Sequence, residues 1–487
     1  MVVALEATNQ TGPEAGIVMA GVSPHPPIIV PEVGGAEAER AADTSRALQE
    51  LARRVKAAQP ETVIIISPHA PVFRDATAIL GEPRLEGSFS AFGAGQVKLA
   101  RENDLELVQL IEEEIARAGQ MTVRLDRETA ARYGTTAALD HGVLVPLYYL
   151  DKEGVQSKLV AMAMAFLPQE ELYALGRAID AAARKSGKRV VLIASGDLSH
   201  RLLPEAPAGY DPEAKRFDQA VAAAIKKGDV ADLLNIDPNL VERAGECGYR
   251  PLIMLFGAFD GRKVEPEVLS YEGPFGVGYL VASLAPGGAD AGRAVGDRLF
   301  ERRAAKIRER RAGMHPLVAL ARETLESFVR TGRKPKVPDD LGKWLGERAG
   351  VFVSLKKHGE LRGCIGTIEP TTASVAHEII QNAVSAGTQD PRFDPVEPEE
   401  LDELDYSVDV LGAAEPISGL DELDPERYGV IVQKGGRSGL LLPHLEGIHS
   451  AEQQVSIAKQ KAGISPHEKD VRLFRFEVVR FRDDSAR

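Results

Sequence analysis

The chain has 487 residues, which exceeds the size of roughly 250 to 300 residues at which single cores stop growing, so at least two domains are expected. Apolar residues make up 44% and charged residues 27%, a balance that is typical of globular proteins and argues against a disordered chain. The formal net charge of −13 argues against non-specific nucleic-acid binding, because neutralising phosphates requires a basic surface.

The N-terminal segment has only a short apolar stretch before Glu6 and no basic region, so it does not resemble a signal peptide. No apolar stretch approaches the roughly 20 residues that cross a bilayer. The two cysteines, Cys247 and Cys364, lie far apart in the sequence, so a disulfide framework is not expected. These features predict a cytoplasmic protein without a membrane-spanning segment.

Apolar, β-rich runs alternate with amphipathic helical stretches in the first part of the chain, residues 1–286. Strands are expected at residues 16–22, 62–66, 158–166 and 189–194. Helices are expected at residues 36–58, 104–118, 169–186 and 212–227. Near-continuous apolar strands separated by helices predict an α/β domain whose sheet is flanked by helices and buried on both faces.

Two of these strands end in nearly the same residues. The first continues into Ser23-Pro24-His25-Pro26-Pro27 and the second into Ser67-Pro68-His69-Ala70-Pro71. Proline restricts its own φ and the conformation of the residue before it, so each histidine is held rigidly just beyond a strand. Open α/β sheets bind ligands at the carboxyl ends of their strands, which makes His25 and His69 candidate site residues.

A third strand ends in the sequence SGDLSH, residues 195–200, and adds Asp197 and His200 to the same edge. The fourth histidine of this part, His141, follows Asp140 where a helix is expected to begin. Histidines at three independent strand ends favour a metal site or an acid/base site over capping or packing roles. Imidazole and carboxylate ligands with an open position suit ferrous iron or zinc.

The two Ser-Pro-His turns, the Asp-His-Gly segment and the SGDLSH strand end resemble the catalytic subunit of class III extradiol dioxygenases and the related Memo proteins. This resemblance covers about residues 16–286. It implies that His25 and His69 bind a metal, that His200 transfers protons and that His141 lines the substrate pocket. Asp197 is expected to orient His200 or a group of the substrate.

The resemblance also implies a cofactor and a substrate class. Fe(II) is the first metal to consider, with Zn or Cu as alternatives, and the implied substrate is a small molecule such as a catechol. Ferrous iron would bind a vicinal diol and activate oxygen in the remaining coordination position.

The third metal ligand has two candidates, Glu246 and Cys247. A cysteine followed by glycine, two residues and proline resembles the Memo pattern and selects Cys247, whereas a dioxygenase uses a glutamate, for which Glu246 is the neighbour. A thiolate favours softer metals, while a carboxylate preserves the ferrous facial triad. A small buried hydrophobic side chain is a third interpretation of Cys247.

Residues 287–313 begin with small residues and end in a charged, helix-prone run, which is typical of a linker that enters a new domain. From residue 314 to residue 487 the pattern changes. Helices are expected at residues 315–331, 372–386 and 450–462, and short strands at residues 351–357, 361–368, 405–412, 429–435 and 437–443. This order predicts an α+β domain with a mostly antiparallel sheet.

The segment Leu361-Arg362-Gly363-Cys364-Ile365-Gly366 places a cysteine between two glycines in a strand, which indicates a bulge or a close backbone approach. Together with QDPRF at residues 389–393 and GGRSG at residues 435–439, it resembles the AMMECR1 domain over about residues 315–481. Arg362 and Cys364 form a candidate second site, because Arg362 and His358 could lower the pKa of the thiol. A packed strand thiol is the alternative.

The fusion of a Memo-like domain to an AMMECR1 domain resembles the AmmeMemoRadiSam system, in which these two proteins accompany a radical S-adenosylmethionine (radical SAM) enzyme. With only two cysteines, this chain lacks the three-cysteine motif of that enzyme, so the resemblance implies a separate polypeptide as partner. Two functions remain open: a metal-dependent enzyme, which would be a dioxygenase-like oxidoreductase, and a non-catalytic metal-binding scaffold that acts with the radical SAM enzyme.

Overall fold

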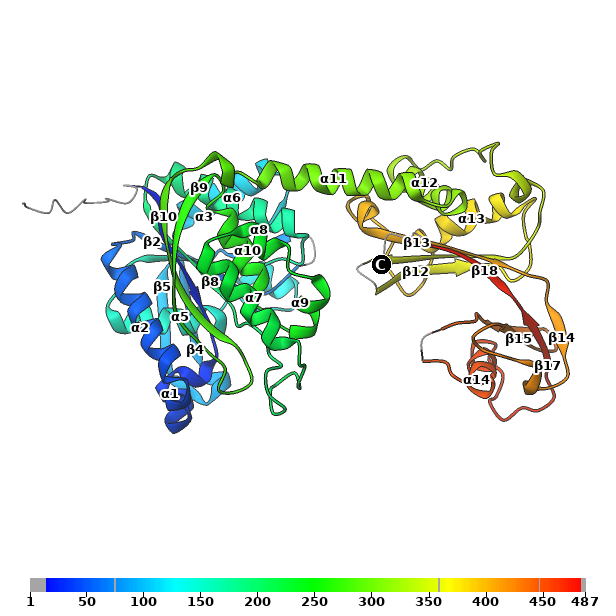
Figure 1. The fold of residues 1–487 in the computed structure, drawn as a ribbon, viewed down its shortest axis with the longest axis horizontal. Helices are drawn as coiled ribbons and strands as arrows, with labels where there is room; N and C mark the ends of the chain where they lie inside the picture. Colours follow the sequence, from blue (N-terminus) through cyan, green and yellow to red (C-terminus); the bar gives the residue numbers. More distant parts are fainter. Residues whose placement is uncertain (1–14, 74–75, 358–359, 446, 483–487) are drawn as a thin grey trace, which may run out of the picture. The chain divides into compact units, whose positions relative to one another are not determined.

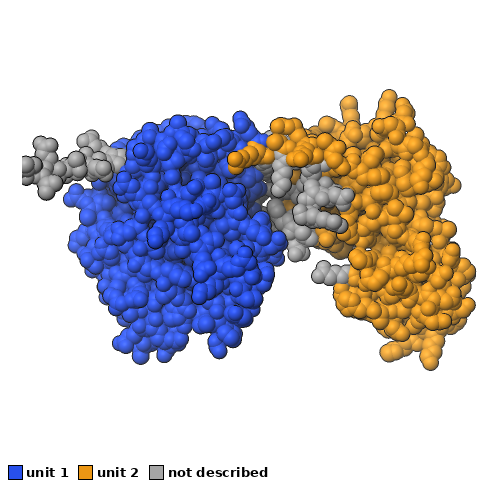
Figure 2. All heavy atoms as spheres, viewed as in Figure 1, with its two compact units in different colours: residues 1–301 blue, residues 302–487 orange. Residues whose placement is uncertain are grey.

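The computed structural model describes residues 15–73, 76–357, 360–445 and 447–482, and it divides into two compact units, residues 1–301 and 302–487 (Figure 1; Figure 2). The division falls inside helix α11 (Gly296–Gly313), which forms the second part of the segment expected to be a linker. The N-terminal segment on which the expected location depends lies outside the described residues. Within the described residues, no helix combines the length and the apolar character needed to cross a bilayer.

Unit 1 is built on an eight-stranded sheet with the order β6-β3-β7-β2-β8-β1-β10-β9 (Figure 1). Its strands are β1 (Gly16–Ser23), β2 (Thr62–Ser67), β3 (Ala76–Leu80), β6 (Met121–Leu125), β7 (Lys158–Ala163), β8 (Arg189–Ser195), β9 (Arg262–Glu272) and β10 (Tyr279–Ala289). The four strands expected from the sequence are β1, β2, β7 and β8, and they pair in parallel at the centre of the sheet. The other four strands were not expected, and of these β6 and β9, at the two edges, have mostly exposed or half-buried residues.

Helices cover both faces of this sheet, as the apolar strand pattern predicts (Figure 1). Along β2, Ile64 and Ile66 belong to one core, whereas Val63 and Ile65 belong to the core on the opposite face. The first core is closed by α3 (Leu105–Arg117), α6 (Gln169–Ser186), α7 (Ala214–Lys227) and α10 (Tyr249–Gly257), and the second by α2 (Ala42–Ala57) and α5 (His141–Glu153). The remaining elements are α1 (Pro31–Gly34), α4 (Arg127–Arg132), α8 (Val230–Leu234), α9 (Pro238–Ala244) and the hairpin of β4 (Arg84–Phe89) and β5 (Ala94–Glu102).

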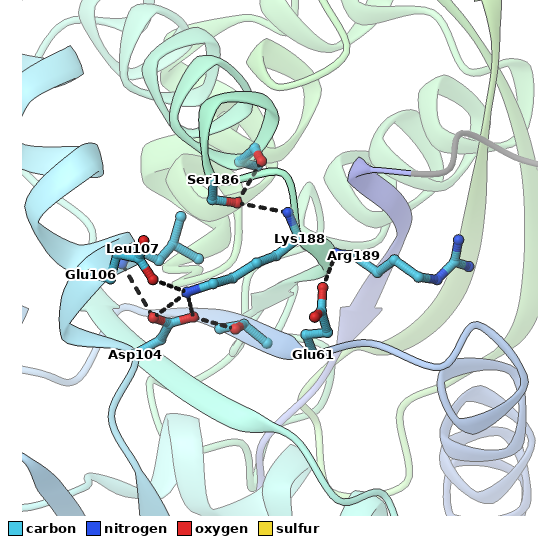
Figure 3. A network of polar contacts seen from close by, with 9 residues as sticks. Glu61, Asp104, Glu106, Leu107, Ser186, Lys188 and Arg189 are labelled. Atoms are coloured by element: carbon cyan, nitrogen blue, oxygen red, sulfur yellow. Dashed lines mark hydrogen bonds and ion pairs between the residues drawn. The ribbon is translucent and has the colours of Figure 1, made fainter.

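A polar network joins the N-terminus of α3 to the edge of the sheet where β2 and β8 begin (Figure 3). Asp104 accepts hydrogen bonds from Lys188 at 2.8 and 2.9 Å and from the Thr62 hydroxyl at 2.5 Å, and it caps α3 through the Leu107 amide. Lys188 also reaches the exposed carboxylate of Glu106. Burial pushes the pKa of Asp104 upward, but the hydrogen bonds from Lys188, Thr62 and Leu107 outweigh it and leave the pKa below its usual value.

Asp104→Ala should destabilise unit 1 by about 3 kcal/mol, because it removes the buried partner of Lys188 together with the α3 cap. The folded-state pKa of Asp104 is depressed, so its contribution is present above the unfolded pKa of about 4 and is lost as the pH falls through the folded pKa. Urea unfolding at neutral and at acidic pH measures both effects. Glu106→Ala is the matched control and should cost less than about 1 kcal/mol, because that carboxylate is exposed. Equal losses of stability in the two variants would contradict the structural role that is assigned to Asp104.

Unit 2 contains two four-stranded antiparallel sheets, where a single mostly antiparallel sheet was expected. The first has the order β12-β11-β13-β18 and packs against α12 (Pro316–Thr331) and α13 (Val375–Thr388), and the second has the order β14-β17-β15-β16 and packs against α14 (Ala451–Lys461). The strands are β11 (Val351–Lys357), β12 (Glu360–Gly366), β13 (Leu404–Leu411), β14 (Glu415–Ile417), β15 (Gly429–Lys434), β16 (Arg437–Leu441), β17 (Arg472–Phe476) and β18 (Val478–Arg482). Strands were expected where β15 and β16 lie, but not at β14, which is only three residues long, or at β17, which a single residue separates from β18.

We expect the two units to fold separately when the chain is divided between Glu301 and Arg302, because each has hydrophobic cores of its own. A division near Ala294, where the linker was expected, would remove Val295 and Leu299 from unit 1, whose core they contact. Separate expression of residues 1–301 and 302–487, followed by thermal unfolding of each fragment, tests this. Two soluble fragments with cooperative transitions are expected, and insolubility of both would argue for a shared core.

Candidate metal centre

Three parallel strands of the central sheet end at one edge, and each is followed by candidate site residues. Ser23 at the end of β1 lies opposite Ser195 at the end of β8, and β2 pairs with β8 up to its last residues, so the three strand ends are level. His25 follows β1 and His69 follows β2, and their ring centroids lie 4.7 Å apart. The register of the sheet therefore brings together the two histidines that the sequence placed at separate strand ends.

The ring of His25 is oriented by the hydroxyl of Ser195. His25 Nδ1 lies 2.9 Å from Ser195 Oγ, and that hydroxyl donates its hydrogen to the carbonyl of Gly142 at 2.5 Å. A hydroxyl has one hydrogen, so Ser195 must accept the second bond from Nδ1–H. The tautomer defined in this way leaves Nε2 of His25 with a free lone pair, 3.6 Å from the sulfur of Cys247.

Cys247 is brought to this edge by a close contact between two loops. The amides of Cys247 and Gly248 both donate to the carbonyl of Asp197, at 3.3 and 2.9 Å, and the Asp197 amide donates to Cys247 Sγ at 3.2 Å. A Cβ added at Gly196 would lie 2.2 Å from the Cα of Gly248. Any side chain at Gly196 would therefore push the loops apart and move the sulfur.

Among the described residues, two groups have ligand atoms that all lie within 4.8 Å of one another. One comprises His25, His69 and Cys247, and the other comprises Asp197, His200 and Cys247. The Cys247 sulfur is common to both, and it lies 3.7 Å from Nε2 of His200. The structure therefore contains a possible metal site formed from histidine, cysteine and aspartate side chains.

The spacing of His25 Nε2 and Cys247 Sγ fits a shared metal ion. Bond lengths of about 2.0 Å to nitrogen and about 2.3 Å to sulfur, with tetrahedral angles, place the two ligand atoms roughly 3.5 Å apart. The separation of His25 Nε2 from Cys247 Sγ agrees with this value. A metal ion that bound both atoms would therefore leave them at about the distance that the structure shows.

The carboxylates of Glu246 and Asp197 have other contacts. Glu246 accepts a hydrogen bond from the Tyr249 amide at 2.5 Å, in the first turn of α10, and it belongs to neither group of clustered donors. Asp197 Oδ1 accepts from the backbone amide of His25 at 2.9 Å, where the sequence had suggested the imidazole of His200 or a substrate group. Burial raises the pKa of each carboxyl to about 7.

His141 is the first residue of α5 and faces the same cluster. Its ring stacks on His69 with centroids 4.2 Å apart and meets the edge of Phe92 at 5.4 Å. Asp140 caps the helix by accepting from the Gly142 amide at 2.7 Å, and it also accepts from the Ser67 hydroxyl at 2.6 Å. This cap fixes the direction in which α5 presents His141.

Burial sets the charge state of the cluster. It lowers the pKa of each imidazole, which keeps the rings neutral and able to donate a lone pair: His25, His69, His141 and His200. Burial also raises the pKa of the Cys247 thiol well above its usual value, and the neighbouring Asp197 adds to that effect. A bound cation would supply the positive charge that a thiolate requires here.

Sequence analysis did not assign roles to Ser195, Asp140 or Phe92. Ser195 belongs to the SGDLSH segment and Asp140 precedes His141, so both were adjacent to recognised residues. Their roles depend on contacts with residues distant in the sequence, such as the Ser195 contact with His25 across 170 positions. Phe92 lies in the β4–β5 hairpin and carried no sequence signal.

The candidate second site at Arg362 and Cys364 is arranged differently from the expectation. A bulge at Arg362 interrupts the pairing of β12 with β11, and the guanidinium binds Glu400, with Nη2 2.8 Å from Oε2. Cys364 accepts a hydrogen bond from Ser354 at 3.1 Å, and Arg392 acts to lower the pKa of the thiol. Burial raises the pKa of the thiol, which opposes activation as a nucleophile, and His358 lies outside the described residues.

The glycines around Cys364 and the later GGRSG segment have structural roles. A Cβ at Gly363 would lie 2.2 Å from the carbonyl of Ala386 in α13, so the close backbone approach predicted for this strand is confirmed. Gly435 and Gly436 form the two-residue turn between β15 and β16.

Comparison with known proteins defines the class of this chain. Residues 19–282 match the family of the catalytic LigB subunit of aromatic ring-opening dioxygenase, and residues 318–481 match the AMMECR1 family. The first match covers more than half of the chain, which therefore belongs to the LigB family. More particularly, it is a fusion of an N-terminal LigB domain with a C-terminal AMMECR1 domain.

Individual relatives match different parts of this arrangement. A Clostridium acetobutylicum protein is 40% identical over 462 residues, which cover 94% of this chain and 98% of that protein. A Thermotoga maritima protein is 50% identical over 175 residues, covering 35% of this chain and 99% of that protein. A solved Pyrococcus horikoshii protein is 35% identical, with a TM-score of 0.32, and covers 34% of this chain and 88% of its own.

Proposed function

We propose that unit 1 is a metal-dependent oxidoreductase of the class III extradiol dioxygenase type. Its substrate is a small molecule, and catecholic vicinal diols are the first class to test. Membership of the LigB family supports ring-opening chemistry. In this proposal His25, His69 and Cys247 hold the metal, which is Fe(II), with Zn or Cu as the alternatives.

The convergence of donors from three separate segments carries this proposal. His25 follows β1, His69 follows β2 and Cys247 precedes α10, yet their ligand atoms lie within 4.8 Å of one another. Neutral imidazoles with a fixed tautomer are the form that binds metal ions.

The remaining residues have distinct roles in the proposed reaction. When bound there, a ferrous ion supplies oxygen activation and open coordination positions for a vicinal diol. His200 accepts and returns protons, because burial keeps its imidazole neutral beside the clustered donors. Asp197 positions His25 by accepting a hydrogen bond from the His25 backbone amide. His141 lies beside Phe92 and lines the path by which a substrate reaches the metal centre.

Metal analysis of the anaerobically purified full-length protein, followed by oxygen-uptake measurements with a panel of catechols, tests the proposal. Stoichiometric iron and substrate-dependent oxygen consumption are expected. Stoichiometric metal without oxygen uptake would contradict the dioxygenase activity. Absence of bound metal would contradict the site itself.

We propose as a second candidate function the non-catalytic metal-binding scaffold that acts with a separate radical SAM enzyme, and the presence of Cys247 among the clustered donors supports only its preference for a softer metal. A thiolate in place of a carboxylate favours softer metals and departs from the ferrous triad. Stoichiometric zinc or copper, together with inactivity towards all catechols, is the result expected for this function.

Cys247→Ala should weaken metal binding more than Glu246→Ala does. The sulfur of Cys247 belongs to both groups of clustered donors, whereas the Glu246 carboxylate caps α10. Loss of an outer-shell partner typically lowers metal affinity about 10- to 100-fold, so loss of a direct ligand should lower it by at least that factor. Competition with a chelator measures both affinities. The reverse ranking would restore the glutamate as third ligand.

A further inference from the structure

Unit 2 contains a cavity of about 1160 Å³ that is lined by residues of both of its sheets. Part of the wall is apolar and includes Phe352 of β11 and Leu440 and Leu442 at the end of β16. Cys364 of β12 also lines the cavity. The metal centre proposed above lies in unit 1, so this cavity is a separate feature.

Two arginines on the wall of this cavity are fixed by buried carboxylates. Arg392 binds Asp390 through Nε at 2.9 Å and Nη2 at 2.6 Å, and Arg480 binds Asp409 through Nε at 2.7 Å and Nη2 at 2.8 Å. The aspartate side chains are only 2% and 3% exposed. The two bonds to each aspartate hold each guanidinium in place. Within the described residues, Nη1 of each guanidinium has no hydrogen-bond partner and remains available to a ligand.

A third cation, Lys461, comes from the end of α14 and lines the same cavity. Its ammonium forms no hydrogen bond or ion pair with the residues that the structure describes. Burial lowers the pKa of Lys461, and repulsion from Arg392 contributes in the same direction, although Cys364 opposes the shift. Lys461 is nevertheless an exposed residue and the Arg392 side chain is 54% exposed, so both cations remain accessible to a ligand that enters the cavity.

Cys364 lies on the wall of the same cavity as these cations. It lines the cavity together with Arg392, Arg480 and Lys461, and Arg392 Nη2 donates a hydrogen bond to the Cys364 carbonyl at 3.3 Å. Burial raises the pKa of this thiol, so at neutral pH it carries no charge that would balance them. Asp390 and Asp409 balance the two arginines, so Lys461 is the cation of these three that has no anionic partner among the described residues.

We propose that the cavity binds a small organic anion, whose phosphate or carboxylate group lies beside Cys364 and contacts Arg392, Arg480 and Lys461. The apolar body of the ligand packs against Phe352, Leu440 and Leu442. Asp405 and Glu426 also line the cavity, so a ligand with a single anionic group fits better than a polyanion such as nucleic acid.

Calorimetric titration of the full-length protein with phenyl phosphate and with benzoate tests this proposal, and p-cresol serves as the uncharged analogue. Saturable binding of at least one anion is expected. The anion with the higher affinity shows whether the cavity prefers a phosphate or a carboxylate group. Binding of p-cresol with equal affinity, or of neither anion, would overturn the proposal.

Lys461→Gln should weaken binding of the preferred anion about tenfold, because it removes a charge-assisted hydrogen bond. This variant should fold normally, since the ammonium has no partner among the described residues. Lys343→Gln is the matched control, an exposed lysine of unit 2 that does not line the cavity, and should bind as the wild type does. Unchanged affinity in Lys461→Gln would overturn the proposal.

Protection of Cys364 locates the bound anion. Alkylation by iodoacetamide, followed by peptide mass spectrometry, should be slowed at Cys364 by the preferred anion and unchanged at Cys247. Binding without protection of Cys364 would show that the anion occupies another site, which would overturn the assignment.

Discussion

His25→Ala should reduce the metal affinity of the full-length protein by more than about 100-fold, because it removes a direct ligand rather than an outer-shell partner. The ring nitrogen lost in this variant is Nε2, which lies 3.6 Å from Cys247 Sγ and has a free lone pair. His69→Ala should have a similar effect, since His69 belongs to the same group of donors. Metal content after dialysis against a chelator measures the loss.

The fold should survive both substitutions, because backbone contacts and flanking prolines hold these turns. The His25 amide still donates to Asp197 in the alanine variant, and Ser195 still donates to Gly142. His467→Ala, which alters an exposed histidine of unit 2, is the control and should retain metal. Full metal occupancy in both His25→Ala and His69→Ala would contradict the assignment of these histidines as metal ligands.

His200→Ala should retain metal, and any turnover found for the wild-type protein should fall by about 10²- to 10⁴-fold, the usual effect of losing a positioned proton-transfer group. Its Nε2 lies 3.7 Å from Cys247 Sγ, but His200 is not in the group that contains both His25 and His69. The backbone of His200 keeps its hydrogen bonds in the variant, including that from its amide to Ala244. Parallel measurements of metal content and turnover separate the two roles.

Two other results for His200→Ala would contradict the proposed role of this residue. Loss of metal would make His200 a direct ligand and would contradict the proposed proton transfer. Survival of both metal and turnover would leave the best candidate for proton chemistry without a role, and it would favour the scaffold function.

Much of unit 1 could be predicted because its information is local. The apolar runs of β2 and β8 define central strands without reference to the rest of the chain, and the helix at residues 169–186 was placed with the bounds that α6 has. Prolines beside His25 and His69 likewise act on neighbouring backbone. In unit 2, by contrast, β14 and β17 are short and their pairing depends on distant residues, so the second sheet could not be predicted.

The sequence by itself determined that two families of domain are joined here and that histidines follow three strands of one sheet, because both facts depend on motifs and on periodicity within short segments. Only the tertiary structure decided which side chains meet. His25 and Cys247 are 222 positions apart, and their contact depends on a loop contact at Gly196 that no local pattern encodes. The bulge at Arg362 and the contact of its guanidinium with Glu400 were decided in the same way. Backbone conformation is set largely by neighbouring residues, whereas the convergence of donors requires the complete path of the chain.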